Sequence, residues 1–472
     1  MGLGLLAAAV VVGAPPSVVL PLAAVPVILT VPWRTLLSWR SLTALLLIVV
    51  VFVPIRRYSL PGNLPFELEP YRVVVAALVL IWLGSLLVDP AVRLRHTGMR
   101  APLFLLVAVI LASIAANADR IGEFGVGADV AKSVTFFASF LLLILLVSSL
   151  LTTREELDAF LRTLVVCMAV LAFFALFEGA TGRNYFNQLD RYLPFLNFDG
   201  LPFSLREGRG GRERAYASAE HPIALGAAFV LVAPIAVYLA RRTGRRLWLG
   251  AAALMLVGTL STVSRTGIVM IVVLGLVYLR LWPRSVKRIL PALLPLVVVV
   301  QLALPGTFGA LRSVFFPEGG IIASEAEGGS TRGSGRLADV GPSLEEWLHR
   351  PLVGQGFGTR ITDKERQNAR ILDDQWLASL LEIGFLGVLA LLWLVGRQSR
   401  RLLRRAREDD GPHGWLCGGL AAGIIAFSIG MFTYDAFSFI QVTILFFLLL
   451  GVSAVALRLP PVGDDDLPRS AA

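Results

Sequence analysis

Arginine and carboxylate side chains stand where they could carry out chemistry on a phosphate-bearing substrate. Arg214 precedes an apolar segment, Arg265 separates two apolar segments, and Arg336 lies in a polar interval that ends at Asp373-Asp374. Arginine binds phosphate oxygens through paired hydrogen bonds and stays charged at any physiological pH. A nearby carboxylate can take the proton from an attacking hydroxyl group. These residue types predict group transfer from a pyrophosphate, with Arg214, Arg265, Asp373 and Asp374 as catalytic candidates.

Further polar and flexible positions accompany these candidates. His221 and the proline after it open an apolar segment, and PLVGQGFGT contains three glycines at every second position. His221 is expected to serve the helix start more than the chemistry, because proline favours the first helical turn. The glycines allow the backbone to turn tightly or to approach a substrate closely. We predict that Arg336, His221, Gly354 and Gly356 bind pyrophosphate or glycan.

The two aspartates have a second interpretation as a helix cap. Aspartate is a favoured N-cap residue, and Asp373-Asp374 directly precede the apolar run that begins at Trp376. One aspartate can cap the helix while the other points into a cavity. The sequence shows no cluster of histidine and cysteine with the spacing of a metal site, so we predict neither a metal nor another cofactor.

The composition excludes an ordinary soluble domain. Of the 472 residues, 56% are hydrophobic and 16% are charged. Apolar runs of about 18 residues or more recur along the chain, as in helices that span a bilayer, whereas a β-barrel would show short alternating segments. The net charge of +10 comes mostly from arginines in short loops, so it indicates membrane orientation and no nucleic-acid binding. The two cysteines fit neither a metal motif nor a disulfide framework.

The hydropathy pattern predicts an all-α polytopic membrane protein with about 12 to 14 transmembrane helices. Residues 1–33 form either a helical hairpin or one broken span, because Pro15-Pro16 interrupts them. The spans predicted after them are 41–55, 69–88, 101–117, 130–151, 156–178, 219–240, 246–262, 265–282, 289–304, 376–395, 414–433 and 437–457.

Loop charges predict the orientation of these spans. Four short loops rich in arginine and lysine fall on one face, which is expected to be cytoplasmic. They lie near residues 93–100, 241–246, 280–288 and 397–407. Arg56 and Arg57 fall on the outer face and argue mildly against this orientation.

The longest polar interval lies between two late spans and divides the chain into four predicted parts. They are an N-terminal transmembrane bundle (1–304), a long periplasmic or extracellular loop (305–374), C-terminal transmembrane helices (375–457) and a cytoplasmic tail (458–472). The outer segments 181–220 and 261–267 lie on the same face as the long loop. Because so polar a loop is costly to keep without a function, we predict that it caps an active site at the outer surface.

At these positions the chain resembles the O-antigen ligase and polymerase superfamily of bacterial membrane glycosyltransferases. The resemblance covers about residues 40–455 and rests on the order and spacing of several short pieces. These are Glu178 followed by TGRNYF, Arg214-Ala215 leading into His221-Pro222-Ile223, Ser264-Arg265-Thr266-Gly267, and Arg336 followed by HRPLVGQGFGT and DDQWLASLLEIGFLG.

The resemblance implies a fold related to the type C glycosyltransferases, with a donor glycan on undecaprenyl pyrophosphate and a glycan or lipid acceptor. It also implies a metal-independent reaction at the outer face of the bacterial cytoplasmic membrane. Arg214 and Arg265, with Arg336 as a third, would correspond to the family's outer-facing arginines. Ligases carry an essential histidine in a His-Asn pair where this chain has Asp373-Asp374. This departure favours a polymerase, or another envelope-polysaccharide transferase, over a lipopolysaccharide ligase.

Two other classes of function stay open. A transporter or flippase of lipid-linked sugars would place its polar groups near the middle of the membrane in broken helices, and Pro234 and Pro295 lie within predicted spans. A scaffolding protein would leave the outer arginines and the long loop unexplained. The gathering of polar groups at one face favours the enzyme.

Overall fold

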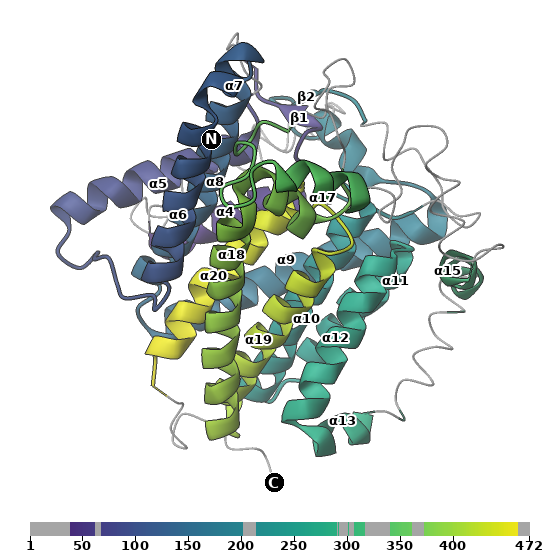
Figure 1. Cartoon of the computed structure of the whole chain (residues 1–472). Coiled ribbons are helices and arrows are strands. Elements are labelled where there is room, and N and C mark those ends of the chain that lie inside the picture. Colours follow the sequence, from purple (N-terminus) through teal and green to yellow (C-terminus); the bar gives the residue numbers. More distant parts are fainter. Residues whose placement is uncertain are drawn as a thin grey trace, which may run out of the picture.

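Helices make up most of the protein, whose computed structural model describes residues 38–61, 68–201, 214–289, 291, 301, 306–316, 340–360 and 372–460 (Figure 1). In chain order the elements are α4 (Trp39–Phe52), β1 (Tyr58–Ser59), α5 (Pro70–Val88), α6 (Arg100–Ala116), α7 (Ala118–Glu123), α8 (Gly127–Leu150), α9 (Arg154–Thr181), η1 (Tyr185–Arg191), β2 (Asn197–Phe198), α10 (Pro222–Thr243), α11 (Leu247–Ser261), α12 (Arg265–Leu281), α13 (Pro283–Ile289), α15 (Thr307–Phe315), α17 (Val340–Leu348), α18 (Gln375–Glu408), α19 (Pro412–Gly430), η4 (Ala436–Ser438) and α20 (Ile440–Arg458).

Helices α10, α19 and α20 lie at the centre of the bundle. In their most apolar segments 94%, 89% and 94% of the residues are buried, against 22% in the peripheral α5. Helix α10 packs against α11 and α19, and α18 packs against α19. Small residues permit this close approach. A Cβ added at Gly419 would lie 3.1 Å from the Pro234 side chain, and one at Gly423 would lie 2.9 Å from the Leu231 carbonyl oxygen.

Local signals in the sequence explain where the helices begin and end. Helix α9 starts with a capping box, in which the Thr153 hydroxyl accepts the Glu156 N–H and the Glu156 carboxylate accepts the Thr153 N–H. It ends at Gly182, whose φ of 70° suits glycine. Such caps replace the hydrogen bonds that a helix cannot make within its own first and last turns.

The polytopic membrane fold predicted from hydropathy is confirmed in its general form. Within the described part of the chain, seven helices are long and apolar enough to cross a membrane: α5, α8, α9, α10, α18, α19 and α20. Helices α4, α6 and α11 are shorter apolar helices. The predicted span 289–304 falls almost entirely outside the described residues, as do residues 1–33; every other predicted span coincides with a helix. Helix α18 continues well past its predicted end, because its second half is rich in arginine and carries no helix breaker.

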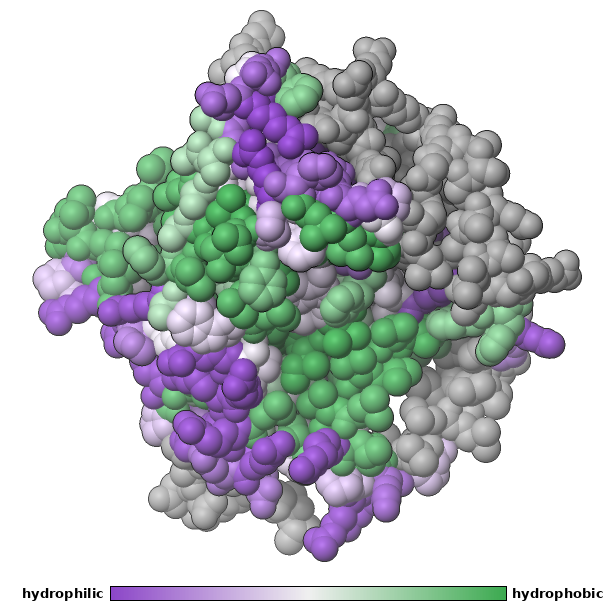
Figure 2. Space-filling model, viewed as in Figure 1, coloured by the Kyte–Doolittle hydropathy of each residue, from purple (hydrophilic) through white to green (hydrophobic). Residues whose placement is uncertain are grey.

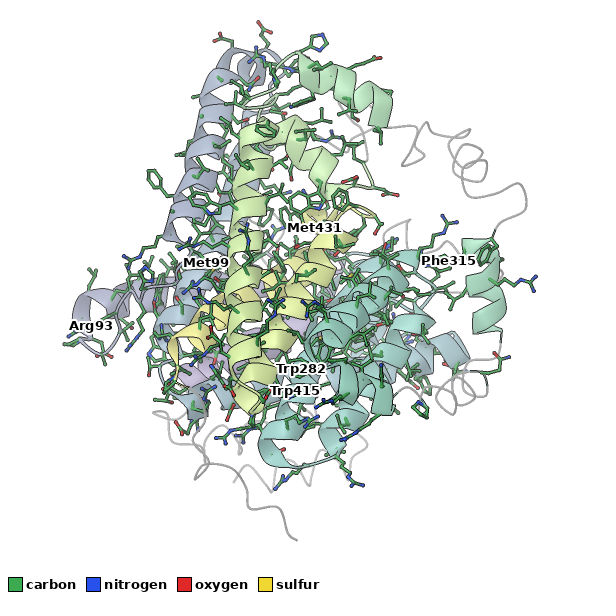
Figure 3. All side chains as sticks on the ribbon, turned by 60° about the horizontal axis from the view of Figure 1, so that its bottom comes forward. Arg93, Met99, Trp282, Phe315, Trp415 and Met431 are labelled. Carbon is green, nitrogen blue, oxygen red and sulfur yellow. The ribbon has the colours of Figure 1, made fainter. Side chains whose placement is uncertain are left out.

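Basic loops meet at one end of the bundle. The Arg397 guanidinium donates to the Gly98 carbonyl at 2.9 Å, and Arg241 lies 4.2 Å above the ring of Trp415. The rings of Trp282 and Trp415 stack with their centroids 3.9 Å apart (Figure 3). The four basic loops predicted to share a face therefore lie together, and we call this the basic end. Figure 2 shows hydrophobic side chains across the middle of the molecule, between hydrophilic regions at both ends.

At the opposite end of the bundle lie several of the described connections between helices. There β1 pairs antiparallel with β2, so that Tyr58 lies opposite Phe198. The α9–α10 connection, the start of α18 and the α19–α20 connection also lie at this end, because each is separated from the basic end by the length of a helix. We call it the polar end. It contains every described residue for which chemistry was predicted from the sequence.

Candidate active site

The turn between α11 and α12 contacts Arg214 and directly precedes Arg265. The Arg214 Nε donates to the Thr262 carbonyl oxygen at 3.0 Å, and the N–H of the next residue, Ala215, donates to the Ser261 carbonyl at 3.3 Å. Arg265 is the first residue of α12 and is half-buried. We name residues 261–265 with Arg214 the arginine turn. Two guanidinium groups at one turn can bind a pyrophosphate.

A buried arginine holds the segment that carries Arg214. Arg57 is 0% exposed, and its guanidinium donates to the carbonyl oxygens of Ala217 and Ala219, each at 2.9 Å, and to Asn187 Oδ1 at 2.7 Å. Burial lowers the pKa of Arg57 to about 10, so it remains charged at neutral pH. Arg57, which seemed to contradict the predicted orientation, is therefore a structural support of the segment that carries Arg214.

Glu178 holds the same segment through its backbone N–H groups. Its Oε2 accepts the N–H of Ala217 at 2.7 Å and that of Tyr216 at 3.2 Å, and its Oε1 accepts the Asn184 amide at 2.9 Å. Ala217 has a φ of +44°, a conformation that is costly for a non-glycine residue. Because Arg57 takes the carbonyls and Glu178 takes the N–H groups, the segment is fixed on both sides.

His221 caps α10 and contacts the next connection. Its Nδ1 accepts the Ile223 N–H at 3.1 Å, and its ring stacks on Phe439 with 5.4 Å between ring centroids. This position matches a role at the helix start. Nearby, Glu220 is buried, accepts the Gln441 N–H at 3.0 Å and lies 3.5 Å from Arg56 Nε. Burial raises the pKa of Glu220 to about 7, although the Arg56 charge lowers it.

The two aspartates before α18 differ in position. Asp374 Oδ1 accepts the Leu377 N–H at 3.0 Å and is the N-cap of the helix. Asp373 is exposed. Its charge helps to raise the pKa of Asp435, so the two carboxylates lie near each other. Asp374 therefore caps the helix, and the Asp373 carboxylate does not.

Helix α18 is broken at Gly384, and a glycine-rich turn fills the break. Gly384 has φ 65° and ψ −171°. The Phe385 and Leu386 N–H groups donate to the carbonyls of Pro351 and Leu352 at 2.8 and 3.1 Å. In return the Gln355 N–H donates to the Leu381 carbonyl at 2.8 Å. We name residues 351–358 the glycine turn. It supplies the hydrogen bonds that the broken helix would otherwise lack within the apolar layer.

Only glycine fits where the two backbones meet. Gly354 has φ 72°, and a Cβ there would lie 2.6 Å from the Glu382 carbonyl group. A Cβ at Gly356 would lie 2.7 Å from the Thr359 side chain, with φ 112°. The predicted close approach of the glycines therefore involves protein backbone. Helix α6 secures the turn, since Asn117 Nδ2 donates to the Gly354 carbonyl at 3.1 Å.

A cavity of about 380 Å³ opens beside the glycine turn, and we name it the outer cavity. Its wall combines cations, carboxylates, amide and hydroxyl groups, and phenylalanines. The polar members include Arg56, Asp129, Lys132, Ser133, Arg360, Gln375, Ser379, Glu382, Asp435 and Ser438, and the aromatic members are Phe136, Phe137, Phe140, Phe357 and Phe437. This mixture suits a ligand that has both polar and apolar parts.

The carboxylates of the outer cavity lie at positions far apart in the chain. Burial raises the pKa of Asp435, while its hydrogen bond from Ser438 and the charge of Arg360 act in the opposite direction. Glu382 is half-buried in α18 and lies close to the Gly358 backbone N–H. Among the described residues, no group of three or more His, Cys, Asp or Glu side chains is placed to hold a metal ion.

Four of the predicted site residues thus lie in two turns. Arg214 and Arg265 belong to the arginine turn, whereas Gly354 and Gly356 belong to the glycine turn beside the outer cavity. Arg336 lies outside the described residues. Sequence reasoning missed the cavity residues Arg56, Arg360 and Asp435. The available signal for Asp435 was a lone carboxylate between two apolar runs, in TYDAF.

A comparison with known families finds a match, and it covers the later part of the chain that forms this site. The model of the O-antigen ligase family matches residues 250–392, which include the α11–α12 turn, the glycine turn and the start of α18. A comparison with curated proteins found no match. This match supports a ligase-like or polymerase-like membrane enzyme. The match of residues 250–392 to the model of the O-antigen ligase family confirms the resemblance of the chain to the O-antigen ligase and polymerase superfamily.

Proposed function

We propose that this protein is a metal-independent glycosyltransferase of the bacterial cytoplasmic membrane. It would transfer a glycan from undecaprenyl pyrophosphate to a glycan or lipid acceptor, as a polymerase or a ligase. The observation that carries the proposal is the O-antigen ligase match over residues 250–392, which includes Arg265 and Asp373. The basic end is assigned to the cytoplasm because positive loops stay on that side. The polar end, with the arginine turn and the outer cavity, then faces outward.

The arginine turn is proposed to bind the pyrophosphate of the donor. The acceptor hydroxyl oxygen attacks the anomeric carbon, and the bond from that carbon to the pyrophosphate oxygen breaks with its electron pair. Undecaprenyl pyrophosphate leaves with this added negative charge. Arg214 and Arg265 stabilise the developing charge, because fixed cations in a partly dry site interact strongly with a departing anion. The support of Arg214 by Arg57 and Glu178 reduces the reorganisation that this step requires.

Asp373 is proposed to accept the proton of the attacking hydroxyl. Asp374 is already used as the N-cap of α18, so the roles that the sequence left open are divided between the two residues. Asp373→Asn should lower kcat much more than it weakens donor binding, because asparagine cannot accept the proton. An unchanged kcat in this variant would remove Asp373 from the mechanism.

The decisive experiment is a transfer assay with purified protein in nanodiscs, undecaprenyl-pyrophosphate oligosaccharide from the host's envelope, and EDTA. Release of undecaprenyl pyrophosphate with a ladder of longer glycans identifies a polymerase. Release with one shift onto another acceptor identifies a ligase. Arg214→Ala and Arg265→Ala should abolish release, and lysine should restore little of it because the guanidinium fork is lost. Arg183→Ala is the matched control, since Arg183 is exposed just after α9.

One observation favours a transporter of lipid-linked sugars as the second candidate. Helix α18 is broken at Gly384, and broken helices are common at transporter binding sites. Here, however, the glycine turn occupies the hydrogen-bonding groups at the break. If the assay shows no release with folded protein and a verified donor, flipping of the same lipid in proteoliposomes becomes the next measurement.

A further inference from the structure

We propose that arginines at the basic end bind a phospholipid with two phosphate groups, in the leaflet on that side of the membrane. They are Arg95 in the α5–α6 connection, Arg397 and Arg401 on α18, and Arg458 at the end of α20. We name these residues the basic cluster. The inference is independent of the proposed transfer, because the arginine turn and the outer cavity lie at the opposite end of the bundle.

Hydrogen bonds hold α18 against the connection that contains Arg95. The Arg397 Nε donates to the Gly98 carbonyl oxygen at 2.9 Å, and the Arg401 Nη1 donates to the Thr97 carbonyl oxygen at 3.5 Å. A Cβ at Gly98 would lie 1.7 Å from the same Arg401 nitrogen. The absence of a side chain therefore lets the Arg401 guanidinium lie against the backbone of the connection.

A second set of contacts brings Arg458 to the same place. Gln398, which lies between the two arginines of α18, donates from its Nε2 to Ser453 Oγ at 2.7 Å and so joins α18 to α20 near its end. Arg458 donates to two backbone carbonyls at the end of α8, at 2.9 and 2.7 Å. It lies close enough to Arg95 for the two charges to interact. Cations from three separate parts of the chain thus gather at one position.

No carboxylate among the described residues forms an ion pair with a member of the basic cluster. The ion pairs in this part of the chain involve Arg56, Arg72, Arg242, Arg404 and Arg405. The hydrogen bonds of the cluster go to uncharged carbonyl oxygens, and the Arg95 Nε is buried without a partner. Because neighbouring cations repel one another, an anion among them is stabilised. Two phosphate groups offer several oxygens to the guanidinium groups.

The face of α18 beside the cluster favours a lipid over a soluble anion. Phe385, Leu389 and Trp393 are exposed apolar side chains of this face, and Arg397 follows one helical turn after Trp393. Tryptophan is enriched at the membrane–water interface, and one helical turn of about 5 Å reaches into the headgroup layer. Figure 2 shows the change from hydrophobic to hydrophilic surface along α18 toward the basic end. The acyl chains would lie along the apolar side chains and the phosphates at the arginines.

The test is native mass spectrometry of the full-length protein in detergent, titrated with tetraoleoyl cardiolipin, which carries two phosphates. Dioleoyl phosphatidylglycerol, which carries one, should bind roughly tenfold more weakly because it engages fewer arginines. Arg397→Gln combined with Arg401→Gln should weaken cardiolipin binding roughly 25-fold, since each arginine near an anionic lipid contributes about fivefold. The matched control is Arg284→Gln with Arg288→Gln, which removes two exposed arginines of α13 at the same end and should leave the affinity unchanged.

Arg95→Gln is a second variant that should spare the fold, because the buried Arg95 Nε has no hydrogen-bond partner to lose. It should weaken cardiolipin binding about fivefold. An equal loss of affinity in the α13 control would reduce the cluster to general attraction by a basic surface. Equal affinity for the two lipids would remove the two-phosphate site.

Two further outcomes would assign the basic cluster to another anion. Complete displacement of cardiolipin by an equal concentration of inorganic pyrophosphate would identify a site for a soluble anion. The sequence also contains three aspartates near its C-terminus, at positions 464–466. A large gain in cardiolipin affinity when Asp464→Asn, Asp465→Asn and Asp466→Asn are combined would show that this acidic segment occupies the cluster. An unchanged affinity in that triple variant is the result expected for a lipid site.

Discussion

Replacing Gly384 with alanine should detach the glycine turn from the broken helix. Alanine must adopt φ 65° with ψ −171°, a backbone region that essentially only glycine populates and that costs an L-residue about 1–3 kcal/mol. Its Cβ would also overlap the backbone of Leu352, which cannot move without opening the turn. Opening the turn breaks the hydrogen bonds that join it to both sides of the break, each worth about 1 kcal/mol net. The local structure should therefore lose about 4–6 kcal/mol in total.

Gly125→Ala supplies a matched control that separates these two costs. Gly125 has nearly the same φ, +63°, but no atom lies within 4 Å of the position its Cβ would take. The control should therefore lose only the conformational part, about 1–2 kcal/mol. The difference between the variants, about 3 kcal/mol, belongs to the contact between the glycine turn and α18.

Hydrogen–deuterium exchange with mass spectrometry measures this difference. Peptides that contain the amides of Gln355, Phe385 and Leu386 should exchange roughly 10²-fold faster in Gly384→Ala than in Gly125→Ala, since each 1.36 kcal/mol is a factor of ten. Equal exchange in the two variants would refute the docking of the turn in the break. The transfer assay should decline in parallel, because the turn forms one wall of the outer cavity.

Three further predictions concern the supports of the site. Arg57→Met should lower the Tm strongly and remove about 3–5 kcal/mol of stability, because it leaves the carbonyls that Arg57 holds without donors, whereas Arg183→Met should not change the Tm. Burial raises the pKa of Glu220 from 4.5 to about 7. Between these two pH values the folded protein keeps a proton that the unfolded chain releases, so its stability falls as the pH rises. Glu220→Gln should therefore reduce the dependence of the Tm on pH between about pH 5 and about pH 8. Asp374→Asn should leave the Tm nearly unchanged, while Asp374→Ala should cost about 1 kcal/mol, because only alanine loses the cap.

Hydropathy predicted the helices well because burial in lipid depends on local composition. The run 130–151 became α8 and the run 156–178 became α9 with only small changes at the ends. The break at Gly384 was not predicted, since a glycine within an apolar run is equally compatible with a continuous helix. The close neighbour of Gly384 is the backbone of a turn about 30 residues earlier in the chain, at Leu352 and Gly354.

The candidate site was only partly predictable for a similar reason. Arg214 and Arg265 stand beside helix starts, so their sequence context indicated their location. The outer cavity combines Arg56, Arg360 and Asp435 from three connections between helices. Their juxtaposition depends on the packing of α8, α18 and α20, which no spacing in a single sequence encodes. Arg57 was misjudged because a buried arginine and a surface arginine look alike until their hydrogen-bond partners are known.

The position of Arg57 also constrains how the protein is made. Its carbonyl and amide partners lie 130 to 162 residues later in the chain. At a synthesis rate of about 5–20 residues per second, roughly 8–30 s pass between the emergence of Arg57 and that of its last partner. Until its last partner emerges, the Arg57 guanidinium cannot complete these hydrogen bonds within the protein, so its remaining donors need water. The hydrogen bonds of Arg57 at this end of the bundle must therefore wait for the segment before α10.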